Sequence, residues 1–381
     1  MSKFLIASYY TIQDMASGGK RRVNELARAL QDDVLLVQPA PTHPSFFCSP
    51  FPADFGRRKR GINWGIFNLY WPANRRAARR TVAQYPPQVI IETSIWCHDA
   101  FSGCRVPRVL DAQNVDGRTM EERFGRRHYF TRLVRAQERR TVHEVAHVFC
   151  CSDIDAEFFC RDYALPDHRV TVAPNGVHLE RSPIDDPETA KVRRELDGQC
   201  ILFFMGKLDY TPNIEALNFI ARTVLPELER RMPGRFVCLV SGGPRWPGCA
   251  MHPGLRYLGQ VPHVAPWIAL ADICLAPVFS GSGTRLKILE YLAGGKPVVA
   301  TAKAAEGLAL VHGGEVLLAE RQCFADAVFQ LENNPGAARD MGDRGRLLVQ
   351  SRYTWEQTSK IWRDGLAQII RAETSPGDLR A

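Results

Sequence analysis

The fold is decided by one stretch, Gly281-Ser282-Gly283-Thr284-Arg285-Leu286-Lys287-Ile288-Leu289-Glu290-Tyr291-Leu292-Ala293-Gly294-Gly295-Lys296-Pro297-Val298-Val299-Ala300-Thr301. A glycine and serine loop follows an apolar run, and a short helix comes next. The glycine pair then ends this helix before a buried strand at 297–301. Loop, helix and strand in this order are typical of a connection in a parallel α/β sheet.

The helix in this stretch begins where an anion could bind. The first turn of a helix leaves backbone N–H groups unpaired and carries the positive end of the helix dipole. Arg285 and Lys287 add positive charge at this end, and Glu290 follows with a carboxylate that can accept hydrogen bonds from sugar hydroxyls. An anion beside a polyol outlines a nucleotide sugar. A lone Gly-x-Gly is explained better by an ordinary βαβ connection with basic surface residues than by a nucleotide-sugar site. The rest of the chain therefore has to decide between these two interpretations.

Length and composition indicate two globular domains. The chain has 381 residues, of which 45% are apolar and 24% charged, and this length exceeds one ordinary core. A net charge of +8 favours anionic partners such as phosphates, nucleic acid or acidic lipid. The 11 cysteines lack zinc or disulfide spacing, which is typical of buried thiols in a reducing cytoplasm. Since no apolar run is long enough for a membrane span or a signal peptide, we expect a cytoplasmic protein.

The first half alternates strands with helices. Residues 4–8 predict a strand, and 20–30 predict a helix with one apolar face. Between them, Gly18 and Gly19 allow a ligand to approach the helix N-terminus, although an ordinary tight turn explains them equally. Further strands are expected at 34–37, 89–92, 108–112, 145–150 and 170–173, and one long charged helix is expected at 117–144.

Polar residues follow the strand at 108–112. Asp111, Gln113 and Asp116 stand at its carboxyl end, where parallel sheets bind ligands, so they are candidates for contacting an acceptor or sugar. A purely structural role is the competing interpretation for the two aspartates. Residues 39–80 are rich in arginine and aromatic side chains, which suits a membrane interface or an anionic acceptor. A solvated helix face over a small aromatic core explains the same residues.

The second half repeats the alternation of strands and helices. Strands are expected at 200–205, 236–240, 255–258, 273–277, 297–301 and 315–318, and the tail at 324–372 is expected to be helical. Such alternation predicts parallel sheets with right-handed crossovers, and two sheets in tandem place a cleft between them. We expect an N-terminal domain at 1–180, a C-terminal domain at 181–355, and a final helix at 356–381 that packs back toward the N-terminal domain.

The second half also carries a series of motifs in a fixed order. They are Met205-Gly206-Lys207-Leu208-Asp209-Tyr210-Thr211-Pro212-Asn213, Leu258-Gly259-Gln260-Val261, the stretch 281–290, Gly295-Lys296-Pro297-Val298-Val299-Ala300-Thr301 and Glu306-Gly307-Leu308. In these residues the chain resembles the group 1 glycosyltransferases, the retaining family 4 with the GT-B fold, and most closely the exopolysaccharide-associated branch. Gly18-Gly19 and Pro174-Asn175-Gly176-Val177 also fall where this family has them.

The resemblance implies a fold and a set of site residues. The fold is α/β of the GT-B type, with two Rossmann-like doubly wound domains facing a central cleft. Lys207 matches the basic residue that stabilises the departing diphosphate, and Glu290 matches the glutamate that holds the ribose. The implied donor-binding set is Gly18, Gly19, Gly206, Asn213, Val261, Ser282, Gly283, Thr284 and Glu290. Gly18 and Gly19 belong to the loop beside the diphosphate and acceptor, Gly283 and Thr284 cradle phosphate or sugar, and Val261 lines the base pocket.

Three positions depart from the family pattern. Ser282 replaces the first glutamate of the E-x7-E motif, Asn213 replaces a second basic residue, and Gln113 replaces a histidine that contacts the donor sugar. The pattern of the branch that the chain resembles implies that Arg285 and Lys287 supply the missing positive charge. We therefore take Lys207, Arg285 and Lys287 as the catalytic candidates, since fixed positive charge stabilises a leaving phosphate.

The resemblance implies a retaining, hexosyltransferase-type enzyme of polysaccharide or glycoconjugate synthesis. It moves a sugar from a nucleotide-diphosphate donor, a UDP or GDP sugar, to the hydroxyl of a sugar or lipid-linked acceptor. No Asp-x-Asp follows a strand, so we expect no metal and no cofactor. The positive net charge also fits peripheral contact with the inner face of an anionic membrane. The strands carry no pattern of aromatic residues for stacking on bases, so we expect no nucleic-acid partner. The alternative is a catalytically altered GT-B protein, either epimerase-like or binding nucleotide sugar or nucleic acid without transfer.

Overall fold

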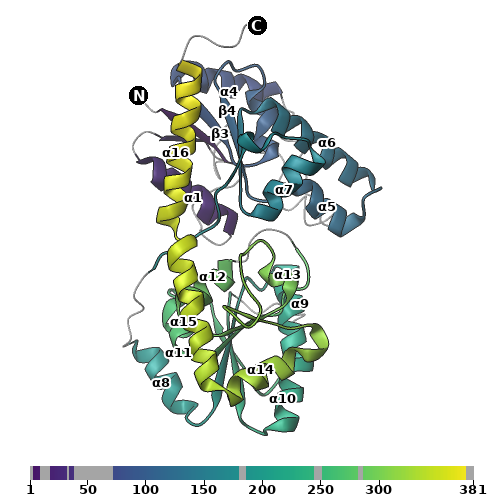
Figure 1. Cartoon of the computed structure of the whole chain (residues 1–381), viewed down its shortest axis with the longest axis vertical. Coiled ribbons are helices and arrows are strands. Elements are labelled where there is room, and N and C mark those ends of the chain that lie inside the picture. The colour runs from purple at the N-terminus through teal and green to yellow at the C-terminus, as the bar shows by residue number, and fades with distance from the viewer. Residues whose placement is uncertain are drawn as a thin grey trace. The chain divides into compact units, whose positions relative to one another are not determined.

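The chain forms two compact α/β units (Figure 1). The computed structural model describes residues 3–8, 18–31, 34–37, 72–179, 186–243, 251–281 and 286–374. The first unit comprises Met1–Pro174 and Glu356–Ala381, and the second comprises Asn175–Trp355. Each contains a six-stranded parallel sheet, which confirms the prediction of two Rossmann-like doubly wound domains.

The sheet of the first unit has a doubly wound order. In sheet order its strands are β2 (Val34–Val37), β1 (Phe4–Ala7), β3 (Val89–Glu92), β4 (Arg108–Ala112), β5 (His147–Cys150) and β6 (Val170–Val172), and all neighbours pair in parallel. The chain order reverses between β1 and β3. The helices are α1 (Gly18–Leu30), α4 (Pro72–Gln84), α5 (Asp116–Phe124), α6 (Tyr129–Glu144), α7 (Asp153–Asp162), the final α16 (Trp355–Thr374, whose first residue belongs to the second unit), and the 3-10 segments η2 (Ile95–Phe101) and η3 (Asp167–Arg169).

The sheet of the second unit has the order of a dinucleotide-binding fold. In sheet order its strands are β12 (Leu317–Leu318), β11 (Val298–Ala300), β10 (Ile273–Ala276), β7 (Cys200–Met205), β8 (Phe236–Ser241) and β9 (Leu255–Gly259). The chain order reverses between β7 and β10, and open α/β sheets bind ligands at the carboxyl ends of the strands at this point. The two strands that flank it lead into the motifs at 206–213 and 281–290.

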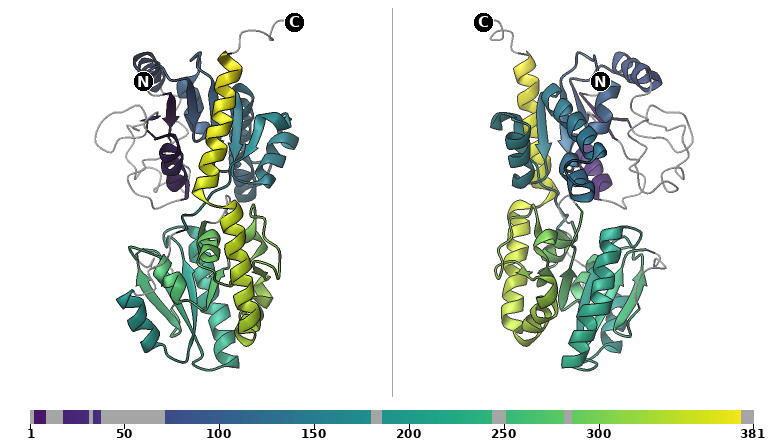
Figure 2. Two further views of the ribbon diagram at one scale, coloured as in Figure 1. Left: turned by 60° about the vertical axis from the view of Figure 1, so that its left-hand side comes forward. Right: turned by 90° about the vertical axis from the view of Figure 1, so that its right-hand side faces the viewer.

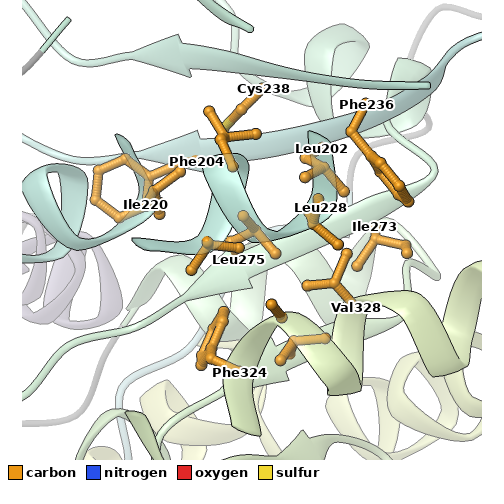
Figure 3. Packing of buried hydrophobic residues seen from close by; sticks show 14 of the residues in the cluster. Leu202, Phe204, Ile220, Leu228, Phe236, Cys238, Ile273, Leu275, Phe324 and Val328 are labelled. Atoms are coloured by element: carbon orange, nitrogen blue, oxygen red, sulfur yellow. The ribbon is translucent and has the colours of Figure 1, made fainter. Parts of the chain in front are cut away.

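The helices of the second unit cover both faces of its sheet (Figure 1). They are α8 (Pro187–Glu195), α9 (Thr211–Phe219), the π-helical turn η4 (Ile220–Val224), α10 (Leu225–Arg231), α11 (Ala265–Leu270), α12 (Leu286–Ala293), α13 (Ala302–Ala305), the 3-10 segment η5 (Arg321–Cys323), α14 (Phe324–Asn333) and α15 (Pro335–Arg352). Alternate strand residues face opposite ways, as a buried parallel sheet requires. Leu202 and Phe204 pack with Ile220, Leu228 and Phe324 (Figure 3), whereas other strand residues pack beneath α11 and α12.

One predicted helix is wrong. The sequence predicts a single helix over 117–144, but the structure has two antiparallel helices, α5 and α6, joined at 125–128. Gly125 has φ of 85°, a conformation that glycine adopts without strain, and its N–H donates to Glu121 O at 2.8 Å. The glycine therefore ends α5 although the charged pattern continues across it.

A buried ion pair joins three elements of the first unit. Arg22 of α1 donates from Nε to Asp111 Oδ2 at 2.8 Å and from Nη2 to Oδ1 at 2.6 Å, and both side chains are 1% exposed. Trp362 of α16 lies under the guanidinium at 4.9 Å and donates its indole N–H to Asp111 Oδ1 at 3.2 Å. Burial lowers the pKa of Arg22, but the nearby negative charge of Asp111 outweighs this effect, and the pKa of Arg22 is raised. The pair thus holds α1 and α16 against one face of the sheet (Figure 2).

Asp111→Asn should lower the free energy of unfolding by about 3–5 kcal/mol, because it leaves the buried Arg22 charge uncompensated. Urea unfolding followed by circular dichroism measures this change. Asp364→Asn, an exposed position on α16, is the matched control and should change the unfolding free energy by less than about 0.5 kcal/mol. Equal effects of the two substitutions would contradict the structural role of Asp111.

Candidate functional site

The site in the second unit is built where β7 and β8 end. Met205 and Ser241 are partners in the parallel register, and the backbones that follow them touch. A Cβ on Gly242 would lie 1.7 Å from the carbonyl oxygen of Gly206, and Gly242 has φ of 151°. Leu208 N donates to Gly242 O at 3.1 Å, and Gly242 N donates to Gly259 O at 2.9 Å. Glycine is therefore required here, because the loops after three strands meet at one point.

The side chain of Asn213 links the two predicted catalytic lysines. Its Nδ2 donates to the carbonyl oxygen of Lys207 at 3.0 Å, and its Oδ1 accepts from Lys287 Nζ at 2.8 Å. Asn213 is 8% exposed, and a Cβ on Gly206 would lie 2.6 Å from its Cγ. The amide is thus packed in a fixed position, and it orients the loop after β7 and the first turn of α12 toward each other.

Lys287 and Lys207 stand in different surroundings. The ammonium of Lys287 lies 4.4 Å from the ring centroid of Phe204 and is half-buried. Lys207 is 57% exposed and pairs with Asp209 at 3.2 Å, an exposed contact that costs little to exchange for a phosphate. The arrangement therefore offers one positive charge held by a buried amide and one exposed positive charge at the same sheet edge.

The hydroxyl of Tyr291 fixes α12 against this edge. Met205 N donates to Tyr291 Oη at 2.9 Å, and Tyr291 is fully buried. The other predicted donor residues in the described part of this unit are Glu290, half-buried on α12, and Val261, which follows β9 and packs against the core beneath α11. Ser282, Gly283, Thr284 and Arg285 lie outside the described residues.

The predicted residues of the first unit lie around the end of β4 and at the start of α1. Gly18 and Gly19 form the first turn of α1, which begins at Gly18. Asp111 points both oxygens at Arg22 rather than into a ligand site. Gln113 is half-buried, and its Nε2 is a buried donor without a partner in the described part of the chain. A buried donor without a partner is costly, so Gln113 is a polar group available to a ligand.

Asp116 belongs to a pair of carboxyl groups. Glu138 of α6 is fully buried and accepts from Asp116 N at 2.7 Å, Gly117 N at 3.0 Å and Tyr163 Oη at 2.7 Å. It therefore caps the N-terminus of α5. Burial raises the pKa of Asp116 to about 7, and burial together with the charge of Asp116 raises the pKa of Glu138 to about 8. Because the two groups interact, they share protons near neutral pH.

Several residues that build the site were not identified from the sequence. Phe204 lies beneath Lys287, Tyr291 anchors α12, and Gly242 permits the backbone contact. A glycine pair directly after a buried strand, Gly242-Gly243, is the one signal that could have been used. The partners Arg22 and Glu138 have no local signal, since each lies far along the chain from the group it binds.

Family models match both halves of the chain. Residues 16–181 match the model described as Glycosyltransferase Family 4, and residues 199–334 match the model described as Glycosyl transferases group 1. The two matches are consecutive along the chain, and together they cover every strand of the two sheets except β1.

Two similar proteins are named as glycosyltransferases. A D-inositol 3-phosphate glycosyltransferase of Pseudarthrobacter chlorophenolicus is 27% identical over 241 residues, 59% of this chain and 56% of that protein. One of the same name from Actinosynnema mirum is 26% identical over 251 residues, 58% of this chain and 57% of that protein. The chain thus spans about half the length of the curated relatives it matches.

Solved structures share the fold over nearly the whole chain. Sucrose-phosphate synthase from Thermosynechococcus elongatus superposes with a TM-score of 0.75 at 17% identity, covering 97% of this chain and 99% of that one. Anabaena HepE, solved in complex with UDP and glucose, superposes with a TM-score of 0.69 at 13% identity, covering 96% and 100%. Such low identities establish the fold alone.

Gly242→Ala should lower the free energy of unfolding by about 3 kcal/mol or more, because the new Cβ would collide with the backbone of Gly206. The adjacent Gly243, with φ of 88° and open space around its Cβ position, is the matched control. Gly243→Ala should cost only about 1–2 kcal/mol of backbone strain. Denaturant unfolding of both variants checks the difference, and equal costs would show that the contact after β7 and β8 is not tight.

Proposed function

The chain belongs to the group 1 glycosyltransferases of family 4, and from that premise we propose a retaining enzyme that uses a nucleotide-diphosphate sugar. The sugar passes to a hydroxyl of a sugar or lipid-linked acceptor, in polysaccharide or glycoconjugate synthesis. The observation that carries this proposal is the Lys287–Asn213–Lys207 arrangement at the reversal point of the second sheet. A UDP or GDP sugar is the donor we expect, and UDP has the support of the HepE complex.

In the proposed mechanism the leaving diphosphate meets fixed positive charge. When the bond from the anomeric carbon to the phosphate oxygen breaks, negative charge grows on that oxygen, and positioned cations stabilise the transition state. Lys287 is held by Asn213 and needs no rearrangement, whereas Lys207 exchanges Asp209 for the phosphate. Arg285 is a third candidate on sequence grounds. With these charges the proposed reaction needs neither metal nor cofactor.

The acceptor side of the proposal rests on Asp116 and Gln113. Both follow β4 at the carboxyl edge of the first sheet, and each has a side-chain group available for a ligand hydroxyl. The Asp116–Glu138 pair changes charge near neutral pH, because burial raises the pKa of both groups. We infer that the ionised form of Asp116 accepts a hydrogen bond from the acceptor hydroxyl, while Gln113 contacts the donor sugar in place of the family's histidine.

The proposal places the enzyme in the cytoplasm with peripheral contact to an anionic membrane. The net charge of +8 supports an anionic partner. No helix among the described residues is long and apolar enough to cross a membrane. The basic and aromatic run at 57–71 lies outside the described residues.

Lys207→Met should lower kcat by about 100-fold and change donor affinity much less, since its charge acts on the leaving phosphate. Release of nucleoside diphosphate from the donor measures kcat, and calorimetry measures affinity. Lys191→Met removes an exposed lysine of α8 and should leave both values unchanged. An unchanged kcat in Lys207→Met would remove this lysine from the mechanism, and conversion of the donor sugar to its epimer would contradict transfer itself.

The rate at limiting acceptor should rise with pH through about 7, because ionised Asp116 accepts a hydrogen bond from the acceptor hydroxyl much more strongly than protonated Asp116 does. Asp116→Asn should flatten this part of the pH profile and lower the rate above pH 7 by about 100-fold. The measurement is kcat/KM for the acceptor between acid and alkaline pH. If the variant kept the same rising limb, the titrating group would lie elsewhere.

A further inference from the structure

The turn between α5 and α6 is a firmly built projection. Gly125 ends α5, and Thr131, which is fully buried, donates from Oγ1 to Gly125 O at 2.9 Å and to Met120 O at 3.2 Å. Below the turn, Arg135 pairs with Glu121 at 2.7 Å. The two helices therefore hold each other, and the hairpin extends away from the sheet of the first unit (Figure 1). We define residues 123–133 as the hairpin tip.

The hairpin tip exposes large apolar side chains together. Tyr129 is 67% exposed, Leu133 46% and Phe124 37%. The ring of Phe124 stacks on His128 at 5.0 Å, and His128 stacks on Phe130 at 5.5 Å, so the aromatic groups form one cluster. Single exposed apolar residues are ordinary on a protein surface, but a cluster at the end of a projection indicates an interaction site.

The hairpin tip is also strongly positive. Arg123, Arg126, Arg127 and Arg132 are all exposed, and in the described part of the chain none has a carboxylate within ion-pair distance. The two acidic residues nearest to the tip in the sequence already form ion pairs elsewhere. Glu121 pairs with Arg135 at 2.7 Å, and Glu122 pairs with Arg118 at 3.6 Å. Arg118, Arg135 and Arg140, which lie outside the tip, each pair with a carboxylate, whereas the four arginines of the tip pair with none among the described residues. The tip therefore presents uncompensated positive charge around an apolar cluster.

We propose that the hairpin tip docks on a membrane surface that contains anionic headgroups. Exposed arginines gain about 1 kcal/mol each beside an anionic surface, and aromatic side chains prefer the boundary between headgroups and acyl chains. A nucleic acid would use the arginines and the rings but gives no partner to Leu133, which has no face for stacking. The mixture of charge, aromatic rings and an aliphatic side chain fits a lipid surface.

The position of the hairpin gives this docking a consequence for the acceptor. The helix α5 begins at Asp116, four positions after the last residue of β4, and ends at Phe124 in the tip. The same helix thus joins the group that we place on the acceptor hydroxyl to the docking surface. This consequence rests on the proposed function, and it favours an acceptor that is anchored in the lipid layer over a freely dissolved sugar.

Flotation of the full chain with lipid vesicles tests the docking surface. Wild type should bind vesicles of phosphatidylcholine with phosphatidylglycerol and should bind pure phosphatidylcholine weakly. The variant Arg126→Gln, Arg127→Gln, Arg132→Gln should partition on the order of 100-fold less onto the anionic vesicles. The matched control carries Arg222→Gln, Arg339→Gln and Arg346→Gln, three exposed arginines of the second unit. It loses the same charge and should bind like wild type.

A second variant tests the apolar part of the tip. Tyr129→Ser with Leu133→Ser should bind anionic vesicles about tenfold less or weaker, and its remaining binding should fall more steeply with salt. Both side chains are exposed, so circular dichroism should show an unchanged fold. If only the arginine variant lost binding, electrostatic attraction alone would hold the tip on the vesicle surface. This result would overturn the proposed contact with acyl chains.

Three outcomes would overturn the proposal as a whole. They are no vesicle binding by wild type, equal binding by the tip variant and wild type, and tip-dependent binding to RNA or DNA without vesicle binding. Calorimetric titration of the same preparations with UDP-glucose and GDP-mannose keeps the two proposals separate. Vesicle binding needs no nucleotide, so intact donor binding with lost vesicle binding, or the reverse, identifies which proposal has failed.

Discussion

The amide of Asn213 is the contact on which the candidate site depends. It accepts from the ammonium of Lys287 and donates to the backbone of Lys207, and it is packed against Gly206. A hydrogen bond to a charged group contributes about 1.5–3 kcal/mol to stability, so the amide holds the ammonium in place. Because the amide is neutral, the ammonium keeps its charge. In the family pattern a second basic residue stands at this position. Here the neutral amide positions a cation that comes from α12, so the charge remains at the sheet edge although its source in the sequence has changed.

This exchange explains what the sequence could and could not reveal. Alternation of buried strands and helices predicted both sheets, because a parallel sheet covered on both faces leaves continuous apolar runs. The resemblance carried by the motifs at 205–213 and 281–290 implied a donor site that includes Lys207, Asn213 and Lys287. It did not imply that Asn213 binds Lys287, since a contact between residues 74 positions apart has no local signature. The helix at 117–144 was predicted as one element because charged residues continue across Gly125, where only the backbone conformation separates α5 from α6.

The first unit shows how a buried charge can be mistaken for a functional one. Asp111 lies at the carboxyl end of a parallel strand, where ligand-binding residues are common, yet Arg22 and Trp362 occupy its oxygens. Arg22 comes from α1 and Trp362 from α16, so the pair orients two helices on the sheet. Glu138 acts similarly at the start of α5, where it caps the helix beside Asp116. Because buried partners occupy the oxygens of Asp111, the polar groups that remain available to a ligand at this edge include Asp116 and Gln113.

The central claim is that Lys287, positioned by Asn213, binds the diphosphate of a nucleotide sugar. Calorimetric titration of wild type and Lys287→Met with UDP and UMP, and with GDP and GMP, tests it most directly. We predict that wild type binds one of the diphosphates at least about tenfold more tightly than its monophosphate, and that Lys287→Met loses most of this difference. Equal affinity for diphosphate and monophosphate in wild type, or an unchanged difference in Lys287→Met, would contradict the claim.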